Sequence, residues 1–355
     1  MKKTCAKYQK IVFRYLVLFA VAATIQSCLK NDTVTPVSIG VNNSAELLSY
    51  LESKGDYINS SLCPSLITPT DLYSMQNDVI LLDIRDSTKF SDGHIKGAVN
   101  LRQFDIIPFL KKNKIKIDTN IVIVSTNGQS ASFCTAGLRI LGYQKVYALK
   151  YGMASWNSYF SDEWLKAIKT RIEYYADFWA PPKPPFKSLP SVVYSNSNLS
   201  LENKLLDRVT NILSENFTDD VAINYNTTYY YLSDGNVITS WNSYFKICYG
   251  NDSLYFNQSV IGYKTPGHIT GVYYYQSGPV YELRSDQKLQ SLPINNSILI
   301  YSKDGHLSAE LTMYLKILGY DIRSLLFGGS YLFYYVYGPQ KAFSSGSINN
   351  FPYEK

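Results

Sequence analysis

One short succession of patterns occurs twice in this chain and constrains its fold more than any other feature. An apolar β-branched run, a small polar loop with one glycine and an amphipathic run ending in Gly-Tyr follow one another around residues 121–143. The same succession returns 177 positions later, with Ser302 in the place of Ser125. Such a succession predicts a strand, a tight loop and a helix. The first loop residue then stands at the mouth of an α/β sheet, where ligands usually bind.

Further matches in the same order predict a tandem duplication. Residues 77–83 align with 251–257, and Gly93–Ala98 with Gly267–Val272, both at an offset of 174. Leu149, Gly152 and Trp156 align with Leu326, Gly329 and Phe333 at an offset of 177. Short strands alternate with helical segments in each unit. This alternation predicts an α/β fold with two parallel sheets, each flanked by helices.

The predicted domain organisation has five parts. They are a signal peptide (1–27), a tether with a helical lead-in (28–65), a first domain (66–160), a linker (161–198) and a second domain with its own helical lead-in (199–340). Capped amphipathic helices are expected from Ser44 and from Ser200. The Pro-rich stretch 180–190 predicts an extended, stiff linker.

The first 27 residues indicate export. Five basic residues precede an apolar run at 15–24 that is too short to span a membrane comfortably. Ile25-Gln26-Ser27-Cys28 resembles the lipobox of bacterial lipoproteins, which implies a lipidated Cys28 and a cell-envelope protein anchored in a membrane, on the outer membrane by expectation. An ordinary secretory signal with an incidental Cys28 is the alternative. Without these residues the net charge falls from +6 to about +1, so no nucleic-acid partner is predicted.

Together these landmarks resemble the rhodanese (thiosulfate sulfurtransferase) family. The first unit supplies the family's Asp-x-Arg strand end as Asp83 and Arg85, and its Gly-His element as Gly93 and His94. The second unit keeps Gly267 and His268 but carries Asn257-Gln258-Ser259 where the alignment expects Asp-x-Arg. The resemblance implies that both histidines are scaffold residues.

In that family a loop cysteine takes up a sulfur atom as a persulfide. Backbone N–H groups hold the anionic sulfur, often helped by a cation at the end of the loop. Here the cysteine positions hold Ser125 and Ser302, and the loop ends hold Ser130 and Leu307. An alkoxide cannot form a persulfide, so the resemblance predicts no sulfur transfer through either loop. The predicted ligand loops are Ser125, Thr126, Asn127, Gly128, Gln129 and Ser130, and Ser302, Lys303, Asp304, Gly305, His306 and Leu307.

Three functions remain open. The leading one is a noncatalytic module that binds a small anion or a protein partner through the two loops. The second is residual sulfur handling, either by binding sulfane-sulfur species or by using Cys63, Cys134 or Cys248 as an off-loop thiol. The third is a purely structural lipoprotein.

His306 also raises the possibility of a serine hydrolase, but no carboxylate is visible to orient it, and a loop histidine is expected to face solvent. Lys303 and His306 favour anion binding at the second loop over the first, whereas Asp304 between them disfavours it. The scattered Cys and His residues predict no metal site, and no cofactor is expected.

Overall fold

The computed structural model describes residues 41–168, 176–177, 180–194, 198–217, 221–223, 230–231, 237–238, 243–256, 268–269, 271–332 and 343–355. Residues 41–194 and 198–355, which include both repeated units, form one compact body. Cys28 and the whole predicted signal peptide, Gly267, the stretch 257–259 and Phe333 lie outside the described residues.

The first five-stranded sheet is entirely parallel, in the order β2-β6-β5-β3-β4. Every residue of the central strand β5 is buried, as expected for a parallel strand covered on both faces. The strands are β2 (Leu66–Ile67), β3 (Ile80–Asp83), β4 (Val99–Asn100), β5 (Ile121–Val124) and β6 (Val146–Leu149). The helices are α3 (Pro69–Met75), α4 (Ser87–Asp92), α5 (Ile106–Lys112), α6 (Gln129–Ile140), α7 (Met153–Trp156) and α8 (Asp162–Ala167).

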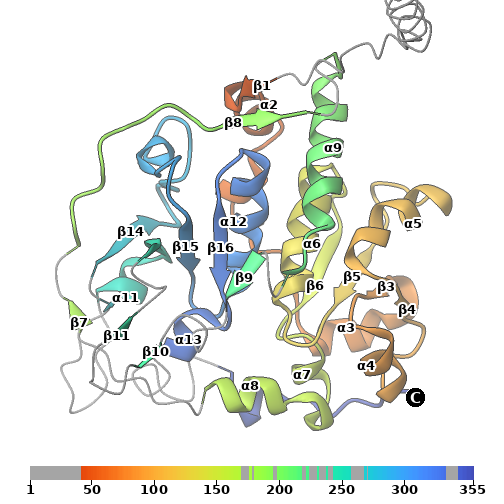
Figure 1. Ribbon diagram of the computed structural model, residues 1–355. Coiled ribbons are helices and arrows are strands. Elements are labelled where there is room, and N and C mark those ends of the chain that lie inside the picture. Colours follow the sequence, from red (N-terminus) through yellow and green to blue (C-terminus); the bar gives the residue numbers. More distant parts are fainter. Residues whose placement is uncertain are drawn as a thin grey trace, which may run out of the picture. The chain divides into compact units, whose positions relative to one another are not determined.

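A second five-stranded parallel sheet has the matching order β14-β12-β15-β16-β9, in blue and teal in Figure 1. Its strands are β9 (Ala222–Ile223), β12 (Phe245–Gly250), β14 (Val272–Gln276), β15 (Ile298–Tyr301) and β16 (Ile322–Leu325). Its helices are α9 (Leu201–Leu213), α11 (Asp252–Tyr255), α12 (His306–Ile317) and α13 (Gly328–Leu332). The expectation of an α/β fold with two helix-flanked parallel sheets is therefore confirmed.

The alignment of 77–83 with 251–257 is wrong. Strand register pairs Asp83 with Val124 in the first sheet and Cys248 with Tyr301 in the second, so Cys248 is the counterpart of Asp83. Residue 251 instead caps α11: Asn251 accepts a hydrogen bond from Leu254 N, just as Asp86 accepts one from Lys89 N before α4. The apolar pattern of 251–257 misled the alignment because it belongs to this helix.

The second alignment error is a shift of one residue. Val146 pairs with Ile121, and Ile322 with Ile298, so the connection after Gly319-Tyr320 is one residue shorter than after Gly142-Tyr143. Leu325 and Gly328, rather than Leu326 and Gly329, are consequently the counterparts of Leu149 and Gly152.

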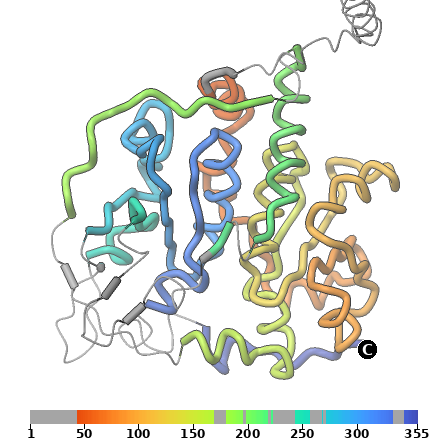
Figure 2. Tube along the Cα trace, in the orientation of Figure 1, coloured from red at the N-terminus to blue at the C-terminus, as the bar shows by residue number. Residues whose placement is uncertain are grey.

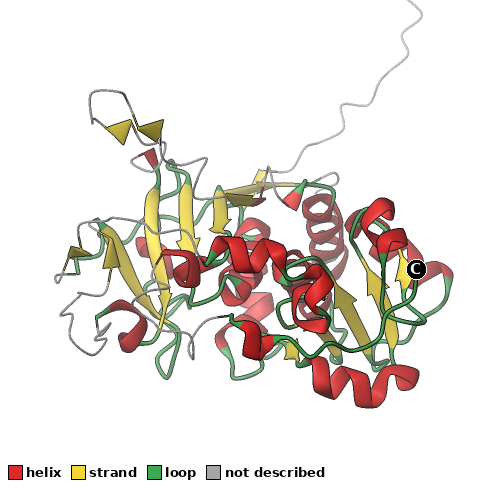
Figure 3. Cartoon of the chain, turned by 90° about the horizontal axis from the view of Figure 1, so that it is seen from below, coloured by secondary structure: helices red, strands yellow, loops and turns green. Residues whose placement is uncertain are grey.

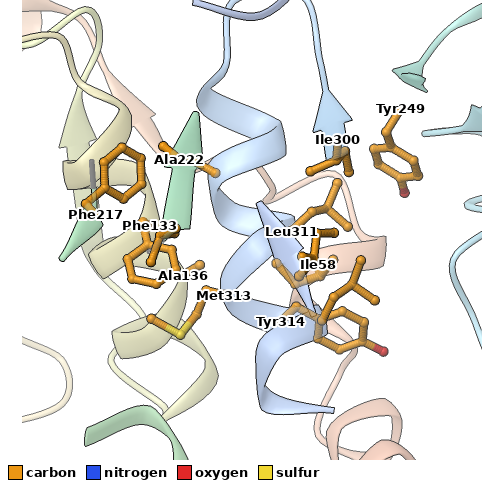
Figure 4. Packing of buried hydrophobic residues seen from close by; sticks show 14 of the residues in the cluster. Ile58, Phe133, Ala136, Phe217, Ala222, Tyr249, Ile300, Leu311, Met313 and Tyr314 are labelled. Carbon is orange, nitrogen blue, oxygen red and sulfur yellow. The ribbon is translucent and has the colours of Figure 1, made fainter. Parts of the chain in front are cut away.

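The core between the two sheets is built mainly from α6 and α12. Figure 4 shows Phe133 and Ala136 of α6 facing Met313 of α12, with Phe217 and Ala222 alongside. All five are at most 5% exposed. A Cβ at Gly137 would lie 3.1 Å from Met313 Cε, so this glycine lets the two helices approach closely. The two sheets therefore share one apolar core.

The segments outside the sheets tie the two units together. Strand β1 (Val41–Asn43) pairs antiparallel with β8 (Ser191–Val193), and α2 (Ala45–Ser53) follows β1. Ser44 makes no capping hydrogen bond to α2, contrary to expectation, whereas Ser200 caps α9 through Asn203 N. The remaining short strands are β7 (Ala176–Asp177) with β13 (His268–Ile269), and β10 (Tyr230–Tyr231) with β11 (Val237–Ile238). Short 3₁₀ helices span Tyr57–Asn59, Gln76–Asp78, Gln103–Asp105, Ser158–Phe160, Leu289–Ser291 and Ser345–Ser347.

Residues 343–355 return from the second unit to the first, so the C-terminus lies beside α4 (Figures 1 and 2). His94 and Glu354 exchange both backbone hydrogen bonds, and Trp156 Nε1 donates to Pro352 O. Seen from below, this segment runs as a loop along the helices of the first unit (Figure 3). No helix among the described residues is long and apolar enough to cross a bilayer.

Candidate functional site

The loop at Ser125 is closed around the serine hydroxyl. Ser125 Oγ accepts hydrogen bonds from Gly128 N at 3.0 Å and from Ala131 N at 3.3 Å. Gly128 has φ of 88°, a left-handed conformation that glycine adopts without strain, and it begins α6. The side chain is only 2% exposed. The hydroxyl thus occupies a nest of backbone donors at the start of a helix.

The turn after β6 supports this loop. Met153 N donates to Ser125 O at 2.9 Å, and Trp164 Nε1 donates to Asn127 O at 3.0 Å. A Cβ at Gly152 would lie 2.1 Å from Ser125 O, so only glycine fits there. The loop is therefore held by the turn at Gly152 and by the buried ring of Trp164 in α8, within the predicted linker 161–198.

Three donors of the loop remain open. Gln129 N is bonded to Asn127 Oδ1, but the N–H groups of Thr126, Asn127 and Ser130 have no acceptor among the described residues. Uncommitted N–H groups in a loop before a helix suit an anionic ligand.

These loop residues line a cleft of about 450 Å³. Other walls come from the segments after β3 and β4, because the carboxyl ends of neighbouring parallel strands meet at one edge of the sheet. Residues contributed in this way are Ile84, Arg85, Asp86, Lys89, Arg102, Gln103 and Phe104, and Glu163, Ser214, Glu215, Asn216 and Phe217 complete the lining. Except for Arg85, sequence reasoning missed these residues. The order of the strands would have located those after β3 and β4.

The cleft contains a cation outside the loop. Lys89 Nζ lies 3.4 Å from Thr126 Oγ1. Arg102 is bound to Asp105, and Glu215 is bound to Lys316. Asp86 is occupied as the cap of α4, and Glu163 is exposed at the rim. Lys89 is therefore a cation in contact with the loop, although the loop end itself is Ser130.

Asp83 and Arg85 form a buried ion pair at the wall of the cleft. Arg85 Nη2 lies 2.6 Å from Asp83 Oδ2, and their side chains are 3% and 0% exposed. The same nitrogen donates to Gly93 O at 2.8 Å. Arg85 thus joins the end of β3 to the Gly93-His94 element.

The second loop repeats the backbone of the first. Ser302 Oγ accepts from Ser308 N at 3.0 Å, and Gly329 N donates to Ser302 O at 2.8 Å. Gly305 has φ of 84°, and a Cβ at Gly328 would lie 2.2 Å from Ser302 O. The two loops therefore share the left-handed glycine, a helix N–H bond to the serine hydroxyl and the support from the next turn.

The surroundings of the second loop differ. The counterpart of Arg85 is Gly250, where a Cβ would lie 2.3 Å from Leu254 Cδ2. Leu254, itself the counterpart of Lys89, is 6% exposed and fills this space. The Asp-x-Arg pair is thus replaced by Cys248 and Gly250, not by 257–259, and the cleft cations Arg85 and Lys89 have no equivalents.

His306 does not face solvent, contrary to the sequence-based expectation. It is 0% exposed, with Nδ1 2.9 Å from Ser132 Oγ and Nε2 accepting from Tyr151 N. It is inserted into the first unit because its helix packs against α6. It therefore cannot serve Ser302 as a base, and it adds no cation to the second loop.

The other two histidines have matching environments. His94 Nδ1 lies 3.1 Å from Phe90 O, with its ring stacked on Phe90. His268 Nδ1 lies 3.2 Å from Tyr255 O, with its ring stacked on Tyr255. Each ring fastens a helix, α4 after β3 or α11 after β12, to the later segment that carries the histidine, which is a scaffold arrangement.

The three described cysteines lie outside both loops. Cys134 and Cys248 are 0% exposed, and burial raises the pKa of both thiols, that of Cys248 to about 12. Cys63 is half-buried, and its Sγ lies 3.1 Å from Glu310 Oε2. Burial, followed by the charge of Glu310, raises the pKa of this thiol too. Among the described residues, no three Cys, His, Asp or Glu side chains gather as a possible metal site.

Residues 68–159 match the family model of the rhodanese-like domain. The thiosulfate sulfurtransferase GlpE of Shewanella oneidensis is 32% identical over 92 residues, which cover 26% of this chain and 85% of that protein. GlpE of Pseudoalteromonas translucida is 30% identical over 88 residues, covering 25% of this chain and 82% of that protein. The chain belongs to the rhodanese-like family.

The rhodanese-like match ends before the second sheet. Among solved structures, a rhodanese-related protein of Thermoplasma volcanium aligns with 28% of this chain and 92% of its own, at 18% identity and a TM-score of 0.23. Residues 68–159, which match the family model, contain the Ser125 loop, the Asp83–Arg85 pair and most of the cleft. The rhodanese-like domain is therefore the part of the chain that carries the candidate site.

Proposed function

We propose that this protein is a noncatalytic rhodanese-like protein of the cell envelope. Its first domain binds an anionic group, either a small oxyanion or a carboxylate of a protein partner, in the cleft at Ser125. Its second domain is a degenerate copy of the first, and a lipid on Cys28 tethers both to a membrane, on the outer membrane by our inference. The shared strand order of the two sheets supports the tandem duplication.

The observation that carries the proposal is the state of the Ser125 loop. Its hydroxyl accepts two backbone N–H bonds, three further loop N–H groups have no acceptor among the described residues, and Lys89 contacts Thr126 of the same loop. A serine hydroxyl with no base has little nucleophilic strength and cannot carry sulfur, but the donors around it suit an oxyanion. Binding without sulfur transfer is the function that these groups support best.

The alternative is a residual sulfurtransferase that uses an off-loop cysteine. Two of the three described thiols are fully buried, and the pKa of each is raised, which disfavours the reactive thiolate. Cys63 stays half-buried beside a carboxylate, which is the wrong sign of charge for a reactive thiol. These features favour the binding module.

Two measurements on the full chain test the proposal. Incubation with thiosulfate and cyanide should yield no thiocyanate above the uncatalysed rate, and mass spectrometry should find no added sulfur atom. Titration with sulfate or thiosulfate should show saturable binding that Lys89→Ala weakens and Lys303→Ala, at the second loop, leaves unchanged. Turnover by the unaltered protein, or binding indifferent to Lys89, would contradict the proposal.

A further inference from the structure

Each of the two loops is contacted by one side chain from the other unit. Gln129 and His306 hold the same position in their units, as the first residues of α6 and α12. Gln129 reaches the second loop, where Nε2 donates to Asp304 O at 3.0 Å. His306 reaches the first loop, where a Cβ at Gly128 would lie 2.4 Å from its Cε1. Both side chains are 0% exposed.

The partners of His306 define its tautomer. The backbone N–H of Tyr151 can only donate, so Nε2 must accept, at 3.2 Å. The proton of the neutral ring is then on Nδ1, which donates to Ser132 Oγ at 2.9 Å. His306 therefore bridges the turn after β6 and the helix that begins at the Ser125 loop.

The turn held by His306 is the one that supports Ser125. Tyr151 has φ of 62°, a left-handed conformation that a side chain disfavours, and Gly152 follows with φ of 61°. Met153, next along the chain, donates to Ser125 O. A continuous set of contacts thus runs from His306 through Tyr151 and Gly152 to the loop.

We propose that His306, contributed by the second unit, is a positioning residue for the ligand loop of the first. The inference rests on the proposed function, since a positioned loop matters only if the loop binds a ligand. It also gives the degenerate second unit a role. The loop of that unit lacks the cations of the first cleft, but its helix holds the turn that shapes that cleft.

The charged and titratable groups near His306 are Asp304 on its own loop, with Lys150 and Tyr151 on the turn that it holds. Burial lowers the pKa of His306, which Asp304 opposes and Lys150 reinforces. Protonation would place a second N–H donor at Nε2, directly opposite the N–H of Tyr151. His306 should therefore lose its contact with Tyr151, and no longer hold the turn that supports the Ser125 loop, when the ring is protonated in acid.

The pKa of a thiol placed at position 125 reports the conformation of the loop, and its measurement needs no bound ligand. In Ser125→Cys, the pKa of the introduced thiol follows from the pH dependence of its alkylation by iodoacetamide, read at that site by mass spectrometry. Two backbone N–H groups and a helix N-terminus should hold it below the ordinary value of about 8.5. A displaced loop should raise it by about one unit, which means about tenfold less thiolate at neutral pH.

Two substitutions separate the two contacts of the ring. His306→Gln places an amide oxygen near the Nε2 position and should keep the Tyr151 contact, whereas His306→Asn can restore only the Ser132 contact. In the Ser125→Cys background, we expect the Asn variant to raise the thiol pKa and the Gln variant to leave it near its starting value. His268→Gln, at an equally buried histidine of the second unit, is the matched control and should leave the thiol pKa unchanged.

Equal thiol pKa values in the Asn and Gln variants would overturn the inference. A measurement on the unsubstituted chain covers the case in which either variant fails to fold. The ¹⁵N shifts of His306 must report a proton on Nδ1, and a proton on Nε2 would overturn the inference directly. Failure of sulfate to bind the unaltered chain, with these results intact, would instead reject the proposed function alone.

Discussion

Gly152 packs on Ser125 so closely that a Cβ would lie 2.1 Å from the carbonyl oxygen of the serine, and 2.7 Å from Gly128 N. Because those atoms are backbone, no side-chain movement could relieve the overlap. We expect Gly152→Ala to lower the free energy of unfolding by about 3 kcal/mol or more, through strain and displacement of the loop.

Gly97→Ala is the matched control for Gly152→Ala. Gly97 also has a positive φ, of 78°, but no atom lies within 4 Å of its Cβ position. This substitution should cost only about 1 kcal/mol. Urea denaturation of both variants measures the difference, and equal losses would show that backbone conformation, not the close approach, governs position 152.

Restoring a thiol should distinguish the two loops. Ser125→Cys places a thiol among two backbone donors in an open cleft, so we expect thiocyanate formation from thiosulfate and cyanide to rise by about tenfold or more over the unaltered chain. Ser302→Cys should give no rise, because Leu254 fills the space that Arg85 and Lys89 use in the first unit. A gain in Ser302→Cys without one in Ser125→Cys would contradict this prediction, because it would show that the second unit, not the first, has kept the cleft.

The buried pair Asp83–Arg85 should be costly to break. Arg85→Ala leaves the Asp83 carboxylate unpaired at 0% exposure, so we expect a loss of about 3–5 kcal/mol in the free energy of unfolding. Arg323→Ala, which breaks a partly exposed pair with Asp321, should cost about 1 kcal/mol or less. Thermal unfolding of the two variants checks the contrast, and a similar small loss in both would mean that the Asp83 carboxyl becomes neutral or solvated.

Glu310 should make stability fall as the pH rises. It is 0% exposed and accepts hydrogen bonds from Tyr57 Oη and Ser65 N, and burial raises the pKa of its carboxyl from 4.5 to about 7. Between these two values the folded state holds a proton that the unfolded state has lost. Stability contributed by the neutral carboxyl is therefore complete below pH 4.5 and lost as the pH rises through 7.

The loss attributable to Glu310 over that window is roughly 3 kcal/mol. Urea midpoints at pH 5 and pH 8 should differ less in Glu310→Gln than in the unaltered chain. Glu163→Gln, at an exposed site, should reproduce the unaltered pH dependence. An unchanged pH dependence in Glu310→Gln would mean that the Glu310 carboxyl titrates normally.

Much of the fold could be predicted because local patterns and the repeat agreed. The strand, loop and helix at Ser125 and Ser302 appear where expected, and both loops begin their helices at a left-handed glycine. The alignment failed where one helix carries the residues of a strand pattern: Asn251 to Leu254 cap and begin α11. Only strand register could show that Cys248 occupies the position equivalent to Asp83, because the second unit has nine additional residues before His268.

The candidate site could be predicted only in part. The loop was visible because its residues are consecutive, whereas Lys89, Arg102 and Phe217 reach the cleft from separate segments. His306 was misplaced because a histidine in a polar loop ordinarily meets water, and no pattern along the chain reveals that α12 packs against α6. Contacts between units were the part that local reasoning could not reach.

The segment 343–355 has a consequence for how this protein is made. Phe343 packs against Trp164, and Tyr353 occupies the space that a Cβ at Gly93 would need. These residues leave the ribosome after the whole second unit, yet they cover the first. During synthesis, Trp156 and Gly93 of the first unit lack these contacts until residues 343–355 have been translated. The first unit therefore cannot reach its final form before the second unit has been synthesised.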